Sequence, residues 1–301
     1  MRISDVMIAG SLVAHMQRAS SRLFRLQEQV SSGLAFRRPS ENPPGAVQAA
    51  ALRSGIAELT RYQSNCDQAT STLRMTEVAL TDMSGCLREA RDAALAMSPF
   101  DETGNQALAD QVHHIITRIV SDANSVSEGR YLLSGFEVLT PPLVENPLGV
   151  PPYLYQGDRG DVTVQLSRSI KLTTSLDAAE VLNMDGAVDA GRSDALETLR
   201  QIEEALRAGD RVAIANGLTD SQWHLDRLLA LRGEMGTRMQ QVQMGKQRLG
   251  DGVLTLRDLL SEVQDVDIAE ALIGLKSQEI TYQAAAAAAS TIHRASLLNY
   301  L

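Results

Sequence analysis

The last third of the chain carries a long row of apolar positions separated by alternating gaps of three and four residues. From Leu218 to Val263 this spacing reaches fourteen positions, and only Ser221, Arg232 and Lys246 among them are not apolar. A mean repeat of 3.5 residues is typical of a coiled-coil seam, because one helix alone would leave such a row in water. The pattern predicts a long helix that begins near residue 210 and lies against another long helix.

The first forty residues carry a second row of this kind. Its positions run without a break through residues 9–30, and the predicted helix ends at Gly33. Three prolines in the following stretch, 39–44, disfavour a continuous helix there. Asn42 or Ser40 can accept hydrogen bonds from the first free amides of the next helix. The sequence therefore predicts a helix, a break and a second helix.

The region between these ends is predicted to contain three helices and a segment with strands. A seven-residue recurrence predicts a helix over about 44–97, and a shorter amphipathic pattern ends near 128–129. Prolines and glycines become frequent from 131 to 191. Short strands are expected there at Tyr131–Leu133 and Val162–Leu166, where the residues favour strands.

Helix resumes after this segment. Ser193–Asp194 is a predicted N-cap, and Gly209–Asp210 ends the helix before the long C-terminal one. The glycines inside that long helix permit a bend or break near Gly250–Gly252, since each glycine costs up to about 1 kcal/mol relative to alanine.

These patterns predict a mainly α-helical fold: a long coiled-coil rod formed by the N- and C-terminal segments, with a small β-containing insert. The expected parts are an N-terminal assembly helix, the N-terminal half of the rod, the variable insert, the C-terminal half of the rod and a C-terminal assembly helix, at residues 1–40, 41–135, 136–191, 192–264 and 265–301 respectively.

Composition and charge narrow the class of protein. The net charge of −9 argues against a general nucleic-acid binder, which would present a basic face. The sequence contains no run of 18 apolar residues, so no membrane insertion is expected. Residues 1–4 lead into a polar helix, so no conventional secretory signal is expected. Cys66 and Cys86 lie about 30 Å apart if both are on one helix, too far for a disulfide.

The two ends carry opposite charge. Residues 1–40 have six arginines against Asp5 and Glu28, a net charge of +4, and residues 251–301 have three basic against seven acidic residues, a net charge of −4. Charge and apolar burial both favour pairing of the ends. Their apolar rows, which include a second row at Ala269, Ile273 and Ile280, are wider than one partner would cover. The predicted assembly interface is Leu12, Met16, Leu23, Leu26, Val30, Ile268, Leu272, Leu275, Ile280, Leu297 and Leu298.

Candidate catalytic chemistry is sparse, and no catalytic residue, cofactor or metal is expected. A metalloprotease needs two histidines one helical turn apart, whereas His113 and His114 are adjacent and point to different faces of a helix. The insert, 136–191, contains no histidine or cysteine, which leaves only a carboxylate-based site open there. Arg159-Gly160-Asp161 matches an adhesion tripeptide, but Gly-Asp pairs are also typical of turns.

Motifs near both ends resemble those of the flagellin family. The family's usual loop is Pro-Ser-Asp-Asp-Pro, from which Glu41 and Asn42 depart conservatively. The likeness covers roughly residues 1–135 and 210–301. The stretches that carry it are Met1-Arg2-Ile3-Ser4, Gln27-Glu28-Gln29-Val30-Ser31-Ser32-Gly33, Pro39-Ser40-Glu41-Asn42-Pro43, Leu52-Arg53-Ser54-Gly55-Ile56, Gly129-Arg130-Tyr131-Leu132-Leu133-Ser134-Gly135, Ile268-Ala269-Glu270-Ala271 and Ser296-Leu297-Leu298-Asn299-Tyr300-Leu301.

The resemblance implies a structural component of the bacterial flagellum rather than an enzyme. It implies secretion through the flagellar type III export apparatus, an export chaperone, and self-association in a ring. The Arg-Ile-Ser start and Leu-Asn-Tyr-Leu tail favour a junction adaptor between hook-associated protein 1 and the flagellin filament. Two alternatives stay open: a flagellin that forms the bulk of the filament, and a secreted coiled-coil adhesion factor that acts through 136–191.

Overall fold

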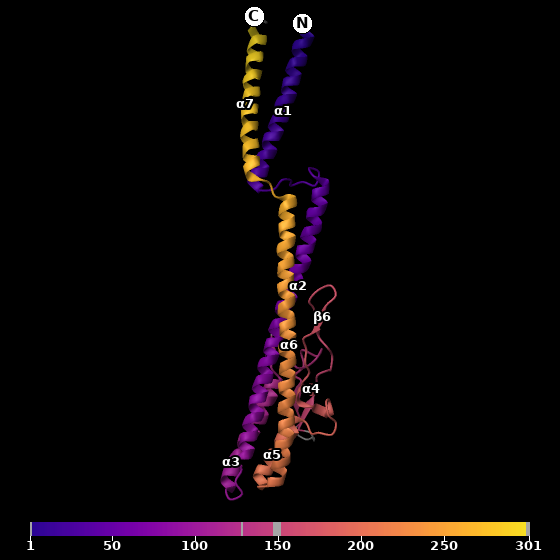
Figure 1. Cartoon of the computed structure of the whole chain (residues 1–301), viewed down its shortest axis with the longest axis vertical. Coiled ribbons are helices and arrows are strands. Elements are labelled where there is room, and N and C mark those ends of the chain that lie inside the picture. The colour runs from indigo at the N-terminus through magenta and orange to yellow at the C-terminus, as the bar shows by residue number, and fades with distance from the viewer. Residues whose placement is uncertain (1, 128, 147–151, 299–301) are drawn as a thin grey trace. The chain divides into compact units, whose positions relative to one another are not determined.

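The computed structural model of this chain is mainly helical and describes residues 2–127, 129–146 and 152–298 (Figure 1). Within these ranges the structure describes the backbone but not the side chains of residues 2–6, 8, 9, 12, 185 and 290–298. The chain divides into two compact units, Met1–Glu58 with Gly252–Leu301, and Leu59–Asp251. Helices α2 (Pro43–Leu95) and α6 (Arg211–Gln264) contribute to both units.

Helices α2 and α6 are the two long helices that the apolar rows predict, and they lie side by side in antiparallel directions (Figure 1). Asp67 pairs with Lys246 and Glu77 pairs with Arg232. Residue numbers therefore rise along α2 where they fall along α6. The helix α6 continues through Gly250–Gly252 without a break, because packing of its apolar side outweighs the low helix propensity of glycine. Buried members of its predicted row are Ser221, Leu225, Leu228, Met235, Val242, Leu249 and Val253.

The second unit adds two shorter helices, α3 (Glu102–Ala123) and α5 (Ala195–Ala208), which pack against each other. Asp194 is the predicted N-cap of α5, since its Oδ1 accepts a hydrogen bond from the amide of Glu197 at 2.7 Å. Gly209 ends α5 with φ of 66°, the left-handed conformation that favours glycine. The largest fully buried side chains of this unit include Leu73, Leu80, Met83, Ile115, Ile119, Leu133, Leu182, Leu196, Leu199, Ile202 and Leu206.

The helix α3 ends five residues earlier than the sequence predicts, at Ala123 rather than near 128. The next residue, Asn124, leaves the helix and pairs with a strand instead. Its Nδ2 donates to the carbonyl of Leu143, and its Oδ1 accepts from the amide of Leu143, both at 2.9 Å. This side chain substitutes for a backbone partner, a contact between distant residues that helix periodicity does not report.

The insert consists of short antiparallel pairs. Strand β1 (Val126–Ser127) pairs with β2 (Arg130–Tyr131), β3 (Leu143–Glu145) with β4 (Tyr153–Tyr155), and β5 (Thr163–Gln165) with β6 (Lys171–Thr173). The small β-containing insert is thus confirmed, although the predicted strands at Tyr131–Leu133 and Val162–Leu166 are shorter than expected.

A short helix in the insert was not predicted. Helix α4 (Ala178–Leu182) is almost entirely buried, and a single turn of 3-10 helix, η1 (Met184–Gly186), follows it. Five residues are too few to show a helical period. The available signal was Asp177, whose Oδ1 caps the amide of Glu180 at 2.6 Å.

Polar contacts attach the insert to both long helices. On α6, Arg238 Nη1 donates to the carbonyls of Thr173 and Ser175 at 3.2 and 3.3 Å. On α2, Asn65 Nδ2 donates to the carbonyl of Gln165 at 2.9 Å. The hairpin of β5 and β6 is therefore fixed to the paired helices by its backbone.

Candidate functional site

The first unit contains the two terminal helices, α1 (Arg2–Ser32) and α7 (Ile268–Leu298), packed side by side (Figure 1). Ala19 is buried in their seam, and its carbonyl accepts a hydrogen bond from Gln278 Nε2 at 3.3 Å. A methyl group added to Gly274 would lie 3.5 Å from Leu26 Cδ2. The predicted pairing of the chain's ends is thus confirmed, and small residues on α7 let the two helices approach closely.

The structure divides the predicted assembly residues into two groups. One group is half-buried and follows the seam between the terminal helices: Met16, Leu23, Leu26, Val30 and Leu275. The other group is exposed on α7: Ile268, Leu272 and Ile280. The side chains of Leu12, Leu297 and Leu298 lie outside the described residues. The first group holds the pair together, so the second group is the part available to other molecules.

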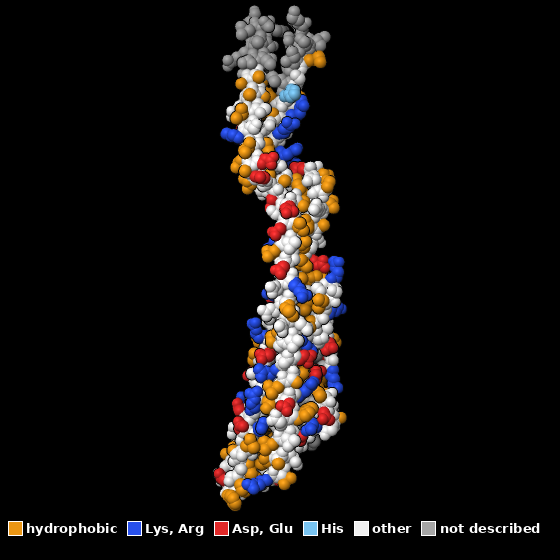
Figure 2. Space-filling view, viewed as in Figure 1, with side chains coloured by type: hydrophobic (Ala, Val, Ile, Leu, Met, Phe, Trp, Pro, Cys, Tyr) orange, Lys and Arg blue, Asp and Glu red, His pale blue; other side chains and the backbone are white. Residues whose placement is uncertain are grey.

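An apolar row runs along the side of α7 that faces away from α1. Ile273 and Ile280 are 73% and 61% exposed and lie seven residues apart, which places them on one face of the helix. Ala269 and Ala284 extend this face by one turn in each direction, and both are exposed. Figure 2 shows hydrophobic side chains along the visible described part of α7. In water this face has a free-energy cost that burial against another molecule would remove.

The outer side of α1 combines exposed apolar side chains with arginines. Phe24 is 65% exposed and Val13 is 55% exposed, while Arg18, Arg22 and Arg25 are also exposed. Figure 2 shows basic side chains along the described part of α1. Phe24 was missed from the predicted interface because it lies outside the row with spacing of three and four. Its signal was a large aromatic side chain off the apolar row, in a chain with only 4% aromatic residues.

The linker between α1 and α2 is anchored at its far end. Asn42 is the N-cap that the sequence allows, since its Oδ1 accepts a hydrogen bond from the amide of Gly45 at 3.1 Å. Phe36 is buried, and a methyl group at Gly45 would lie 3.0 Å from its Cε1. Glycine at this position therefore lets the phenyl ring of the linker sit against the start of α2.

Glu41, one of the residues that departs from the family loop, folds back on the same linker. Its Oε2 accepts hydrogen bonds from the amides of Arg37 and Arg38 at 2.9 and 3.2 Å. These backbone donors lower the pKa of the Glu41 carboxyl below its ordinary value. The ionised carboxylate thus orders the turn that precedes α2.

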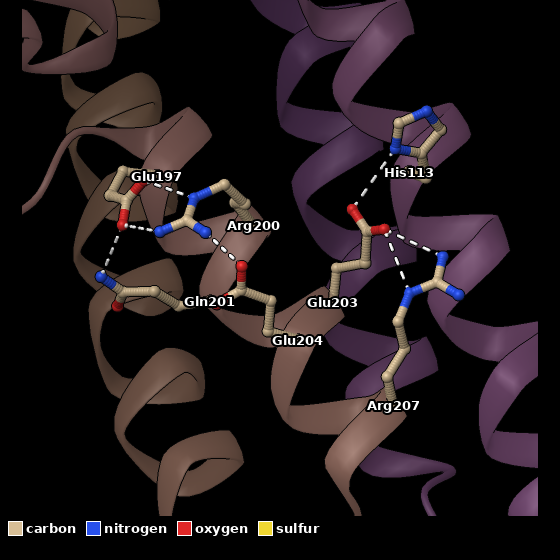
Figure 3. Close-up of polar contacts among 7 residues, drawn as sticks. All are labelled: His113, Glu197, Arg200, Gln201, Glu203, Glu204 and Arg207. Carbon is tan, nitrogen blue, oxygen red and sulfur yellow. Dashed lines mark hydrogen bonds and ion pairs between the residues drawn. The ribbon is translucent and has the colours of Figure 1, made fainter. Parts of the chain in front are cut away.

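One of the two adjacent histidines, His113, takes part in polar contacts between α3 and α5. Figure 3 shows His113 directed from α3 toward Glu203 on α5, with Nδ1 3.4 Å from Oε2, while the same carboxylate accepts from Arg207 Nη2 at 3.0 Å. The pKa of Arg207 is raised by its hydrogen bonds to Glu203 and Asp110. Arg207 connects α5 to α3 through its ion pair with Asp110, and His113 adds a polar contact between the same two helices rather than one half of a metal-binding pair.

A second network lies along α5 itself. Glu197 accepts hydrogen bonds from Arg200 Nε at 2.8 Å and Nη2 at 2.6 Å, and from Gln201 at 3.0 Å (Figure 3). Arg200 also pairs with Glu204. The hydrogen bond from Arg200 lowers the pKa of Glu197. The two residues of each contacting pair are three or four positions apart on α5, a spacing that stabilises a helix.

Other candidate chemistry was sought throughout the described part of the chain. A cavity of about 140 Å³ lies between α2 and the hairpins, and neither imidazole nor carboxylate is among the described residues that line it. Within the described ranges no cluster of histidine, cysteine and acidic residues has the geometry of a metal site. None of the helices described is long and apolar enough to cross a membrane.

Comparison with known proteins follows the division of the chain into two ends and an insert. The bacterial flagellin N-terminal helical region matches residues 3–137, and the bacterial flagellin C-terminal helical region matches residues 222–301. Together these regions contain α2, α3 and α7, all of α1 except Arg2, and most of α6.

Curated relatives match the chain along most of its length. A flagellar hook-associated protein 3 of Salmonella typhimurium is 22% identical over 309 aligned positions, which cover 94% of each chain. The protein of the same name from Escherichia coli is 22% identical over 290 positions and 89% of each chain.

Solved structures share the fold. A flagellar hook-associated protein of Vibrio parahaemolyticus has a TM-score of 0.67 at 18% identity, over 75% of this chain and 100% of that one. FlgL of Bacillus cereus has a TM-score of 0.59 at 22% identity, over 70% and 99% of the two chains. The chain therefore belongs to the bacterial flagellin family and is a structural flagellar protein, not an enzyme.

Proposed function

We propose that this protein is a junction adaptor that joins the hook side of the flagellum to the flagellin filament. The observation that carries the proposal is the pair of terminal helices whose outer apolar faces are exposed, with Phe24 on α1 and Ile273 on α7. Relatives named flagellar hook-associated protein 3, aligned with up to 94% of the chain, support the junction role over that of a bulk filament subunit.

The assembly surface of this adaptor is the outer face of α7 with its neighbours on α1. Ile268, Leu272 and Ile280 contact other subunits, while Met16, Leu23, Leu26, Val30 and Leu275 maintain the pair that presents them. Leu12 on α1 and Leu297 and Leu298 on α7 complete the predicted set. The terminal helices, 1–40 and 265–301, are the assembly segments, and the insert, 136–191, faces outward.

The partners that fit this role are hook-associated protein 1 on one side, flagellin on the other, and further copies of this chain in a ring. The chain leaves the cell through the flagellar type III export apparatus with the help of an export chaperone. The opposite net charges of the two ends help their pairing once the chain is outside.

A deletion strain tests the role. If the protein is the adaptor, hooks persist, filaments are lost, and flagellin is released into the medium. Loss of filaments without secreted flagellin would instead identify a bulk filament subunit. Removal of residues 136–191 separates the adhesion alternative, because an adhesion factor would lose surface binding while motility is kept.

A further inference from the structure

The two linkers that lead to the terminal helices are paired with each other. The amide of Ala35 donates to the carbonyl of Gln264 at 2.7 Å, and the amide of Val266 donates to the carbonyl of Gly33 at 2.9 Å. Leu34 and Asp265 form an antiparallel bridge between these two hydrogen bonds. We call these segments, 33–42 and 264–267, the elbow. The chain thus leaves α1 and enters α7 through one shared backbone pairing.

Side chains from the adjoining helices fix this pairing. Gln264 is only 6% exposed, and its Oε1 accepts a hydrogen bond from Arg53 Nη2 at 2.6 Å. On the opposite side, Gln29 Nε2 donates to the carbonyl of Ala35 at 2.6 Å. Gln29 belongs to α1, Arg53 to α2 and Gln264 to α6, so one network connects three helices at the elbow.

We propose that Arg53 and Gln264 are positioning residues that lock the elbow, so that α1 and α7 present their outer faces as one unit. Gln264 is the point where the network converges, because its backbone oxygen holds the α1 linker while its side-chain oxygen is held by α2. The hydrogen bond from a guanidinium is charge-assisted and stronger than a neutral one. It ties the paired linkers to α2 at Gln264, whereas Phe36 holds the linker against the start of that helix by packing.

The lock matters because the seam between the terminal helices is thin. Among the described side chains of α1, Ala19 is buried in the seam, whereas others such as Leu23 and Leu26 are only half-buried. A thin seam alone opens readily, since few apolar contacts resist local unfolding. The elbow places both helices in register at one end, which lowers the entropy that their pairing would otherwise cost.

Amide exchange in the purified protein tests the lock without reference to any assembly. In Gln264→Leu and in Arg53→Met, the amides of Ala35 and Val266 are expected to exchange about tenfold faster or more, as loss of a charge-assisted hydrogen bond implies. Amides of α3 and α5 should keep their protection, which shows that the second unit remains folded. Gln264→Glu keeps an acceptor for Arg53 and should retain slow exchange.

Ser261→Ala is the matched control. Ser261 Oγ donates to Oδ2 of Asp265, an elbow residue, at 2.5 Å, so this variant removes a side-chain hydrogen bond within the elbow that does not reach α2. It should leave the amides of Ala35 and Val266 close to wild type. Unchanged exchange in Gln264→Leu and Arg53→Met, or an equal increase in Ser261→Ala, would overturn the lock.

The assembly role of the lock rests on the proposed function and needs its own readout. The deletion strain is complemented with each variant, and export of the variant and attachment of filaments are measured. Gln264→Leu and Arg53→Met should be exported but attach few filaments. Faster exchange with normal attachment would remove the positioning role. Absence of a junction defect in the deletion strain itself would refute the proposed function and leave the exchange result standing.

Discussion

Arg232 of α6 donates a hydrogen bond from Nη2 to Oε1 of Glu77 on α2, at 3.1 Å. Arg232 is one of the three positions that interrupt the apolar row of α6, and the two side chains are 28% and 32% exposed. Lys246, another interruption, pairs with Asp67, but both of these side chains are about half exposed. A polar residue in a coiled-coil seam specifies which positions face each other, so the less exposed pair of Glu77 and Arg232 favours one antiparallel register over others.

Charge reversal at one of these pairs should lower stability, and exchange of the charges should restore it. Glu77→Arg places two arginines together and is expected to lower the free energy of unfolding by about 1–2 kcal/mol, between the values for exposed and buried pairs. Arg232→Glu should act similarly, and the double variant should recover most of the loss. Urea denaturation followed by circular dichroism measures all three. A double variant no more stable than the single ones would contradict the register role.

The exposed pair of Glu89 and Arg118 is the control for this experiment. Arg118 Nη1 lies 2.7 Å from Glu89 Oε2, but the side chains are about half exposed. Water and salt screen such a pair, so Glu89→Arg should change stability less than Glu77→Arg.

The apolar rows allowed the long helices and their pairing to be predicted, because burial of a helix face repeats along the sequence. The rows did not give the partners of Arg232 or Lys246, because these partners are on another helix and the periodicity of one helix shows only which of its own faces is buried. The same limit applied to the assembly surface. Leu275 and Leu272 were assigned to one interface, but the structure places Leu275 in the seam with α1 and leaves Leu272 exposed.

The segment before α5 depends on a residue that has no periodic signal. Asn183 is buried in the left-handed conformation, with φ of 57°. Its Oδ1 accepts from the amides of Val188 and Asp189 at 3.0 and 2.9 Å, and its Nδ2 donates to the carbonyls of Asp189 and Arg192 at 3.0 and 3.3 Å. One side chain thus shapes the loop, a role that the sequence alone did not show.

Replacement of Asn183 should therefore cost more than replacement of a surface residue. Asn183→Ala leaves buried backbone groups without their partner and is expected to lower the free energy of unfolding by about 2–4 kcal/mol. Asn183→Asp keeps the acceptor and loses the donor, so its loss should be smaller at neutral pH. Thermal denaturation compares the two. Equal stability of Asn183→Ala and wild type would show that the loop is held by other contacts.

His224 should make stability fall in acid. The imidazole is buried between α6 and α5, with Nε2 3.4 Å from Thr198 Oγ1, and desolvation lowers its pKa from 6.5 to about 4. Between these pH values the unfolded chain binds the proton and the folded chain does not. The free energy of unfolding should therefore decrease as pH falls from about 6.5 to about 4, by roughly 3 kcal/mol in total.

His224→Gln tests this dependence because it keeps a polar side chain but cannot titrate. Urea denaturation at pH 7, 6 and 5 should show a smaller decrease in stability for the variant than for the wild type. The comparison is between slopes, so a uniform loss of stability from imperfect packing does not affect it. Parallel slopes would mean that the histidine is protonated in the folded state over the same range.

A substitution at Leu272, on the outer side of α7, should impair assembly without impairing folding. Its side chain is 48% exposed, so Leu272→Asp should leave the monomer's circular dichroism and unfolding transition nearly unchanged. A carboxylate that must be buried against an apolar surface of a partner loses its hydration, at a large cost in binding free energy. The variant should therefore be exported but attach no filaments. Leu139→Asp is the matched control, because Leu139 is 80% exposed and belongs to the insert in the second unit rather than to a terminal helix. Normal attachment with Leu272→Asp would place the interface on another face of α7, and loss of attachment with both variants would point to a general effect of added negative charge.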